Sequence, residues 1–226
     1  LDAFDARRRR FGRGHPAAGR YNNPLPLPEF PRMKLDAPFV RLPLRFDPDR
    51  LAAEVSQFAE ADWRKHPQGH AGNTALPFVA AGGDPDDDAV RGPMRPTPFL
   101  ARCPYIRQVL AALQAPVGRT RFMRIVGHGE ATAHVDTNYY WSQRVRVHVP
   151  VLTYPGVRFL CGDAEAFMPA GECWLFDTWR LHNVLNPDDR PRVHLVVDTV
   201  GSAEFWELVD AAADADPRPV PFAPRA

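Results

Sequence analysis

Between residues 119 and 200, short runs of β-branched and aromatic residues alternate with turn residues. Such runs occupy residues 121–126, 144–152, 157–160, 173–176 and 193–200. Several short strands at this spacing are typical of a sandwich or jelly roll rather than of a parallel α/β sheet. We therefore predict a mostly β fold with flanking helices.

The flanking residues predict one further strand and three helices. Residues 39–46 alternate in polarity, which predicts a strand, and Pro43 favours an edge position. Asp47 precedes a proline and a helical pattern, so we expect it to cap a helix. Helices are predicted over residues 48–55, 105–113 and 203–212. Residues 66–94 are rich in glycine, aspartate and proline and are predicted to form a loop.

The two ends of the chain differ from its middle. Residues 1–34 hold a basic run and a proline-rich segment without periodicity, which predicts an extension outside the core. Residues 214–226 are again proline-rich and are predicted to be a tail. The chain has 226 residues, of which 45% are hydrophobic. This suits a single domain over residues 35–213.

The bulk composition excludes several classes of partner. The formal net charge is +1, so no nucleic-acid partner is expected. No run approaches the ~20 apolar residues of a membrane span. The three cysteines, Cys103, Cys161 and Cys173, form no CxxC pair, which favours buried apolar positions in a reducing compartment. We therefore expect a cytoplasmic protein, and the sequence leaves its oligomeric state open.

His134 and Asp136 give the first chemical signal. Along an extended chain, residues i and i+2 point to the same side, so the imidazole and the carboxylate are expected to face one point. They supply two thirds of a 2-His-1-carboxylate triad, which leaves three adjacent iron positions open. His182, 46 residues after Asp136 and next to a predicted strand, is the expected third ligand.

Arg192 adds an anion-binding group. It lies ten residues after His182, across a turn at residues 186–191. A turn of this composition predicts a hairpin that returns Arg192 beside the strand with His182. A guanidinium there binds a carboxylate through paired, charge-assisted hydrogen bonds. 2-Oxoglutarate requires this arrangement, because one end chelates iron while its far carboxylate meets the arginine.

The predicted strand at residues 144–152 carries Arg144, Arg146 and His148 on one face and valines on the other. A strand face of this kind is usually solvated. Next to an iron site that binds a dicarboxylate, it is instead suited to line an anion-binding cavity. From the sequence, both interpretations are open.

From about residue 119 to residue 202, the chain resembles the aspartyl/asparaginyl β-hydroxylases, a family of Fe(II)- and 2-oxoglutarate-dependent oxygenases. The resemblance is carried by the order and spacing of His134-Val135-Asp136, Arg144 to His148, Gly171-Glu172, Phe176-Asp177, His182-Asn183, Asn186 and Arg192. It implies a double-stranded β-helix, a cupin-like jelly-roll barrel with iron inside its mouth. Animal members lack an acidic residue at the position of Asp136, and they carry a serine where this chain has Met123.

The resemblance also implies roles for individual residues. It assigns iron binding to His134 and His182, 2-oxoglutarate binding to Arg192, Arg146 and His148, and a substrate carboxylate to Arg144. With Asp136 added from the triad pattern, the expected metal ligands and catalytic residues are His134, Asp136 and His182. The aromatic residues that directly follow the ligands either wall a substrate pocket or pack in the core. They are Tyr139, Tyr140 and Trp141.

The expected activity is hydroxylation of a C–H bond, with 2-oxoglutarate and O2 converted to succinate and CO2. The expected substrate is an amino acid, free, carrier-bound or within a peptide, with an Asp/Asn-like residue favoured by the resemblance. The alternative is a non-oxidative metal-binding jelly roll, such as a cupin-like isomerase or a small-molecule sensor. A structural zinc site is a third interpretation, but it would not require Arg192 or the basic strand.

Three further residues complete the expectations. His128 lies between glycines and is predicted to be in a loop. His194 shares a strand face with Arg192, and a satisfied core histidine is expected there. Asp177, five residues before His182, is expected to orient a metal ligand.

Overall fold

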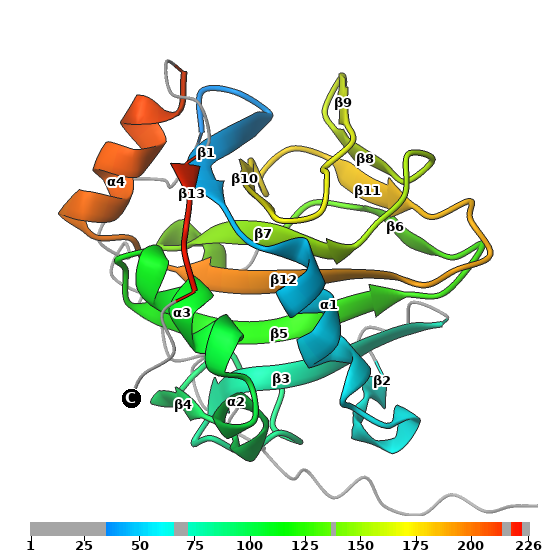
Figure 1. The fold of residues 1–226 in the computed structure, drawn as a ribbon. Coiled ribbons are helices and arrows are strands. Elements are labelled where there is room, and N and C mark those ends of the chain that lie inside the picture. The colour runs from blue at the N-terminus through cyan, green and yellow to red at the C-terminus, as the bar shows by residue number, and fades with distance from the viewer. Residues whose placement is uncertain (1–34, 66–71, 137–138, 214–217, 223–226) are drawn as a thin grey trace, which may run out of the picture. The chain divides into compact units, whose positions relative to one another are not determined.

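The chain runs back and forth between two largely antiparallel β-sheets (Figure 1). The computed structural model describes residues 35–65, 72–136, 139–213 and 218–222. The predicted extension at residues 1–34 lies outside this range, as do His66 and His70 of the predicted loop. The described residues belong to one compact unit, residues 31–226.

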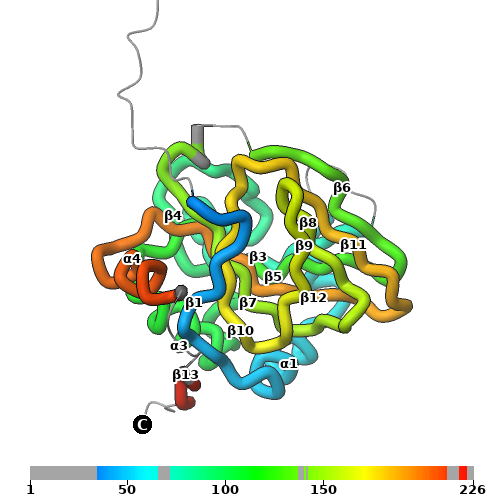
Figure 2. Tube along the Cα trace, turned by 90° about the horizontal axis from the view of Figure 1, so that it is seen from above, coloured from blue at the N-terminus to red at the C-terminus, as the bar shows by residue number. Residues whose placement is uncertain are grey.

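The larger sheet has nine strands and the smaller sheet has four. The larger sheet runs in the order β13 (Arg218–Pro219), β1 (Phe39–Arg45), β10 (Glu172–Phe176), β7 (Val145–Leu152), β12 (Arg192–Thr199), β5 (Val117–Ile125), β3 (Asn73–Ala81) and β2 (Arg64–Lys65), with β4 (Met94–Pro96) paired to β3. The smaller sheet runs in the order β6 (Glu130–His134), β11 (His182–Leu185), β8 (Arg158–Cys161) and β9 (Ala164–Ala166). Figure 2 shows these four strands grouped together on one side.

Eight consecutive strands, β5 to β12, follow the winding of a jelly roll. β5, β7, β10 and β12 are neighbours in the larger sheet, and β6, β8, β9 and β11 make up the smaller one. The chain therefore changes sheet at nearly every connection, as it does in double-sheet jelly rolls. The predicted mostly β fold, a double-stranded β-helix with flanking helices, is confirmed.

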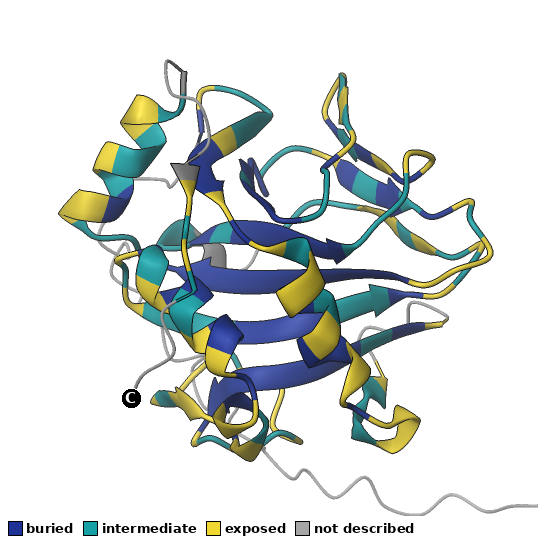
Figure 3. Cartoon of the chain, viewed as in Figure 1, coloured by how far each residue is buried: buried dark blue, intermediate teal, exposed yellow. Residues whose placement is uncertain are grey.

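Two helices, α1 (Pro48–Ser56) and α3 (Pro104–Ala112), cover the outer face of the larger sheet and expose their opposite sides (Figure 3). The predicted cap is present, since Oδ1 of Asp47 accepts hydrogen bonds from the backbone N–H groups of Asp49 and Arg50 at 3.0 and 3.2 Å. The remaining helical elements are α2 (Pro98–Ala101), α4 (Ala203–Asp210) and the 3-10 turns η1 (Glu60–Asp62), η2 (Tyr139–Ser142) and η3 (Ala211–Ala213).

The two faces of β7 differ in chemistry, and this alternation positions the site. Val145, Val147 and Val149 pack with the helices in the main hydrophobic core. Arg146 and His148 alternate with these valines and therefore point to the opposite face. They are not solvated there: the Arg146 side chain is 12% exposed and His148 is 6% exposed. The interpretation of a solvated strand face is therefore wrong.

The prediction that residues 66–94 form a loop is wrong for its central part. β3 (Asn73–Ala81) pairs with β5 along most of its length and is buried at nearly every position. Its side chains form a continuous apolar run because both faces are covered, so the strand lacks the alternation that marks a half-exposed strand. Pro77 adds to this misleading pattern, and the pairing register shifts beside it.

The predicted hairpin between His182 and Arg192 is also wrong. β11 pairs with β6 and β8 in the smaller sheet, whereas β12 pairs with β5 and β7 in the larger sheet. The connection at residues 186–191 therefore crosses from one sheet to the other. Buried Asn186 fixes this crossing through hydrogen bonds from its Nδ2 to the carbonyls of Val126 and Arg190, at 3.0 and 2.8 Å.

The C-terminal tail, the cysteines and the helices were also subjects of prediction. Within the predicted tail, Arg218–Pro219 forms β13, which lies parallel to β1. The three cysteines are buried and form no disulfide. No helix in the described part of the chain is long and apolar enough to cross a membrane.

Candidate metal and co-substrate site

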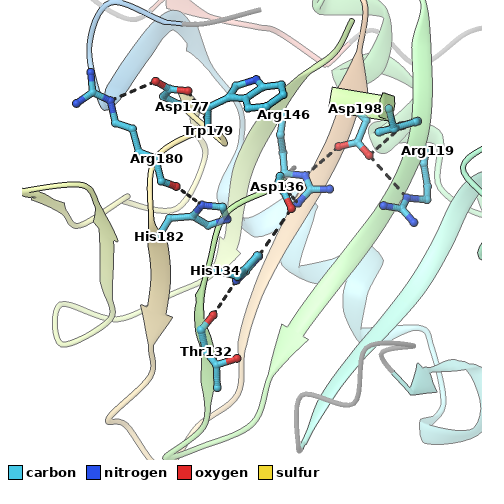
Figure 4. A network of polar contacts seen from close by, with 11 residues as sticks. Arg119, Thr132, His134, Asp136, Arg146, Asp177, Trp179, Arg180, His182 and Asp198 are labelled. Atoms are coloured by element: carbon cyan, nitrogen blue, oxygen red, sulfur yellow. Dashed lines mark hydrogen bonds and ion pairs between the residues drawn. The ribbon is translucent and has the colours of Figure 1, made fainter. Parts of the chain in front are cut away.

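The three predicted metal ligands come together at one end of the smaller sheet (Figure 4). His134 ends β6 and His182 begins β11, and the two residues are register partners across the antiparallel pair. Asp136 follows two residues after His134, with its backbone N–H bonded to the carbonyl of Thr178 at 3.0 Å. One potential ligand atom from each of the three residues lies within 4.8 Å of the other two.

Backbone carbonyls fix the orientation of both imidazole rings. Nδ1 of His134 lies 2.7 Å from the carbonyl of Thr132, and Nδ1 of His182 lies 2.9 Å from the carbonyl of Arg180. A carbonyl only accepts, so each Nδ1 carries the proton and each Nε2 presents its lone pair. Metal-binding histidines are commonly held in this way.

A short turn before β11 supports His182. The carboxylate of Asp177 accepts hydrogen bonds from the backbone N–H of Trp179 at 3.1 Å and from Nε of Arg180 at 3.2 Å. These bonds stabilise the turn in which the carbonyl of Arg180 accepts a hydrogen bond from Nδ1 of His182 (Figure 4). Burial lowers the pKa of His182 to about 4, so the ring is neutral at neutral pH.

This donor set fits a divalent metal such as Fe(II). Two imidazoles and one carboxylate form the facial arrangement of non-haem iron sites, and their three donors leave further coordination positions for small molecules. A cavity of about 320 Å³ lies directly beside them, so those positions face open space. A structural zinc site is instead closed by a fourth protein ligand, and no such ligand joins the cluster among the described residues.

The cavity is lined from both sheets. Arg146 and His148 of β7, Phe176 of β10 and Arg192 of β12 contribute from the larger sheet. The metal ligands and Phe159 of β8 contribute from the smaller sheet. The crossing at residues 186–191 thus brings Arg192 to the same cavity as His182, although their strands are not neighbours.

Arg192 is a buried cation with free hydrogen-bonding capacity. Its residue is 2% exposed, and its Nε has no partner among the described residues. Burial lowers the pKa of Arg192 to about 9, which leaves the guanidinium charged at neutral pH. A buried and unpaired charge is costly, so this position is suited to an anionic ligand.

His194 contacts Arg192 directly. Nη2 of Arg192 lies 2.6 Å from Nδ1 of His194, and Nδ1 of His148 lies 3.2 Å from the same atom. A guanidinium only donates, so Nδ1 of His194 is unprotonated and accepts. Burial and the nearby Arg192 lower the pKa of His194 well below its ordinary value, which keeps the ring neutral. The sequence predicted a satisfied core histidine. His194 is buried and orients the buried arginine through Nδ1, but its Nε2 has no hydrogen-bond partner among the described residues.

Arg146 joins the metal cluster to a buried carboxylate. Its Nη1 lies 3.5 Å from Oδ2 of Asp136, and its Nε donates to Oδ1 of Asp198 at 2.9 Å. Asp198 also accepts a hydrogen bond from the hydroxyl of Tyr140 at 3.1 Å. It forms a further ion pair with Arg119 at 3.7 Å (Figure 4). Burial alone would raise the pKa of Asp198, but Arg146 and Arg119 more than offset it, and the pKa is lowered.

The predicted substrate contacts lie differently from the expectation. Arg144 precedes β7, and its guanidinium stacks over the ring of Tyr140 at 4.2 Å from the ring centre. Tyr140 is fully buried, and neither residue is among those that line the cavity. The side chains of Tyr139 and Trp141 lie outside the described part of the chain.

Sequence reasoning missed the arginines of β5. Arg119 and Arg121 both line the cavity beside Met123. A signal is present in the sequence, because Arg119, Arg121 and Met123 alternate along β5 as the basic residues of β7 do, although the predicted strand began only at residue 121. The apolar residues of the strand predict its presence, whereas its charged face indicates that it lines an anion-binding cavity.

By fold and donor set, the molecule falls in the class of mononuclear non-haem iron oxygenases built on a jelly roll. A comparison with known families agrees. The family model described as aspartyl/asparaginyl beta-hydroxylase matches residues 50–201, and the chain therefore belongs to this family. Fe(II) and 2-oxoglutarate are the cofactors that this family implies, and the cluster of His134, Asp136 and His182 has the donors that Fe(II) requires.

Individual relatives are distant. L-proline cis-3-hydroxylase 1 of a Streptomyces species is 25% identical over 187 residues, which cover 76% of this chain. The aligned part spans 63% of that enzyme, less than two thirds of its length. A solved Pseudomonas putida prolyl-4-hydroxylase is 13% identical (73% of this chain, 92% of that chain, TM-score 0.48). A 2OG-Fe(II) oxygenase from Burkholderia pseudomallei is 18% identical (74% of this chain, 87% of that chain, TM-score 0.47).

Proposed function

We propose that this protein hydroxylates a C–H bond of an amino acid, either free, carrier-bound or within a peptide. The family supports a hydroxylase of the Fe(II)/2-oxoglutarate type. The relative named L-proline cis-3-hydroxylase supports an amino-acid substrate. It adds proline to the Asp/Asn-like residues as a candidate substrate. When bound, Fe(II) and 2-oxoglutarate supply the oxidant that converts C–H to C–OH, while 2-oxoglutarate and O2 become succinate and CO2.

The residues of the chain bind the metal, orient the co-substrate and exclude water. His134, Asp136 and His182 hold the metal on one side, so that its open positions face the cavity. Arg192, oriented by His194, binds the far carboxylate of 2-oxoglutarate. His148 lines the cavity beside the co-substrate, and its Nε2 has no partner among the described residues. Phe159 and Phe176 give the cavity an apolar wall that excludes water near the metal.

One observation carries the proposal. A three-residue metal cluster and a buried arginine without an acidic partner border the same cavity. The alternative, a non-oxidative metal-binding jelly roll, accounts for the cluster but not for Arg192. A buried guanidinium without a counter-ion destabilises the protein unless a ligand supplies the charge.

The test is succinate formation by the iron-loaded full chain supplied with 2-oxoglutarate and O2. A panel of L-amino acids and short peptides, including proline, aspartate and asparagine, is screened by mass spectrometry for the gain of one oxygen atom. Succinate formation with an oxygenated product is the expected result. Tight metal binding with no succinate under any condition would favour the non-oxidative alternative.

Replacing Arg146 with alanine is expected to reduce stability and succinate formation far more than replacing Arg144 with alanine. Arg146→Ala leaves buried Asp198 short of a partner, and breaking a buried ion pair costs about 3–5 kcal/mol of stability. It also removes the contact with Asp136, so succinate formation should fall at least tenfold. Arg144→Ala loses a cation–π contact of ~0.5–1 kcal/mol and one long hydrogen bond to the backbone carbonyl of Tyr140.

The two variants are compared by thermal unfolding, succinate formation and hydroxylated product. Arg144→Ala should retain near-parental values for both products. If this variant formed succinate but no hydroxylated product, Arg144 would contact the substrate after all. Arg146→Lys, which keeps a charge near Asp198, separates the loss of stability from the loss of activity.

A further inference from the structure

Asp198 is a buried carboxylate that neither belongs to the metal cluster nor lines the cavity. It lies near the end of β12, is 1% exposed, and is the register partner of Arg146 on β7. Its Oδ1 accepts a hydrogen bond from Nε of Arg146 at 2.9 Å. Its Oδ2 accepts one from the hydroxyl of Tyr140 at 3.1 Å and pairs with Arg119 at 3.7 Å. Three partners on two oxygens hold this carboxylate in one orientation.

Arg146 connects Asp198 to the metal cluster (Figure 4). Asp198 binds its Nε, while its Nη1 lies 3.5 Å from Oδ2 of Asp136. A guanidinium is planar and rigid, so fixing Nε also fixes the direction in which Nη1 points. The position of Asp198 therefore determines where Arg146 meets Asp136.

The two oxygens of Asp136 face different groups. Oδ2 faces Nη1 of Arg146, whereas Oδ1 lies 3.9 Å from Nε2 of His134, the nitrogen that presents its lone pair to a metal. The contact with Arg146 thus occupies one oxygen of the carboxylate and leaves the other for the metal. A carboxylate that binds through one oxygen takes one coordination position, so three positions stay open.

The packing around Asp198 leaves no spare room. A Cβ atom added at Gly118 of β5 would lie 2.8 Å from the backbone carbonyl oxygen of Asp198 and 3.2 Å from the hydroxyl oxygen of Tyr140. The first distance is too short for a real side chain, so only glycine allows β5 to pass this close. The backbone of β5 therefore helps to keep the carboxylate and its hydroxyl donor in place.

We propose that Asp198 is a positioning residue for the metal site, which holds Arg146 so that Asp136 offers a single oxygen to the metal. The proposal rests on the proposed function, because it takes Asp136 as a metal ligand. A carboxylate with a purely structural role would stabilise the fold and leave metal binding unchanged. The two roles are therefore separated by metal affinity.

The first experiment measures Co(II) binding to the metal-free full chain by visible absorption, without 2-oxoglutarate. Asp198→Asn keeps the size of the side chain and removes its charge. Arg146 then loses the partner that fixes it beside Asp136. The dissociation constant for Co(II) should rise by a factor of ~10 or more, as it does when groups that orient a ligand are lost.

Glu172→Gln is the matched control. Glu172 is also a buried carboxylate, 6% exposed, and it pairs with Arg41 and Arg45 at 3.6 Å, but it does not line the cavity. Both variants remove a buried charge from its ion pairs, so both should melt at a lower temperature than the parent. Only Asp198→Asn should lose affinity for Co(II).

The second experiment repeats the substitution in an Arg146→Met background. If Asp198 acts through Arg146, the group that carries its effect is absent there. Asp198→Asn should then change Co(II) affinity by less than a factor of ~2, in contrast to its effect in the parent. An effect of Asp198 on the net charge of the site would instead be the same in both backgrounds.

Tyr140→Phe provides a milder variant in case Asp198→Asn does not fold. It leaves the charge of Asp198 in place and removes one of its hydrogen-bond donors. Co(II) binding should weaken by a factor of ~3 in the parent and remain unchanged in the Arg146→Met background.

The outcomes separate this proposal from the proposed function. Parental Co(II) affinity in Asp198→Asn, or in Tyr140→Phe where only that variant folds, would overturn the positioning role and leave the metal site intact. Equal losses in the parent and in Arg146→Met would overturn it as well. A parent chain that binds no Co(II) would overturn both the metal site and the role of Asp198.

Discussion

Replacing Arg192 with alanine is expected to raise the 2-oxoglutarate concentration for half-maximal succinate formation by a factor of ~30 or more. Truncating one partner of a buried charge pair costs about 2–5 kcal/mol. Arg192 meets this condition, because it is 2% exposed and has no acidic partner among the described residues. Iron affinity should change little, since Arg192 is not one of the clustered donors. Parallel titrations of 2-oxoglutarate and of metal measure the two effects separately.

Two further variants sharpen this test. Arg192→Lys should recover only part of the loss, because an ammonium group cannot reproduce the planar fork of a guanidinium. Arg190→Ala is the matched control: Arg190 lies on the same crossing, but its side chain is 61% exposed and pairs with Asp188. Unchanged 2-oxoglutarate dependence in Arg192→Ala would transfer this role to Arg121 or Arg146.

Replacing Asp136 with alanine is expected to weaken metal binding more than a hundredfold and to abolish succinate formation. Loss of a group that merely orients a ligand costs ~10- to 100-fold in metal affinity, and loss of a ligand should cost more. His134→Ala and His182→Ala should behave alike, because each removes one of three donors. Metal titration by calorimetry under anaerobic conditions, followed by the succinate assay, tests all three variants.

The controls for this series lie on the surface. His128 and Asp189 form an exposed pair, with Nε2 of His128 2.6 Å from Oδ1 of Asp189, and neither residue belongs to the metal cluster. His128→Ala and Asp189→Ala should leave metal affinity unchanged. If Asp136→Ala retained substantial turnover, two histidines would suffice to hold the iron.

Local rules predicted the parts of the fold that local chemistry determines. Asp47 followed by proline predicted the start of α1, because a carboxylate caps the free N–H groups of a first turn. The i, i+2 spacing of His134 and Asp136 predicted that both side chains face one point, and their ligand atoms do lie close together. Neither inference required knowledge of distant parts of the chain.

The parts that failed depend on tertiary context. β3 escaped detection because both of its faces are buried, which removes alternation from the sequence. The turn at residues 186–191 predicted a reversal of the chain, but its composition does not say which sheet the next strand joins. Likewise, no local pattern distinguishes paired Arg119 from unpaired Arg121, because their difference is set by Asp198 on another strand.

The position of Asp198 at the far end of β12 has a consequence for how such enzymes diversify. Arg192 begins this strand and Asp198 lies close to its end, so one strand carries both the proposed co-substrate anchor and the carboxylate that pairs with Arg119 and Arg146. Substitutions at Arg121 or Met123, which line the cavity from β5, can change its shape and charge without touching the metal ligands. A library confined to these positions is therefore expected to yield altered substrate preference while iron loading and basal 2-oxoglutarate consumption persist.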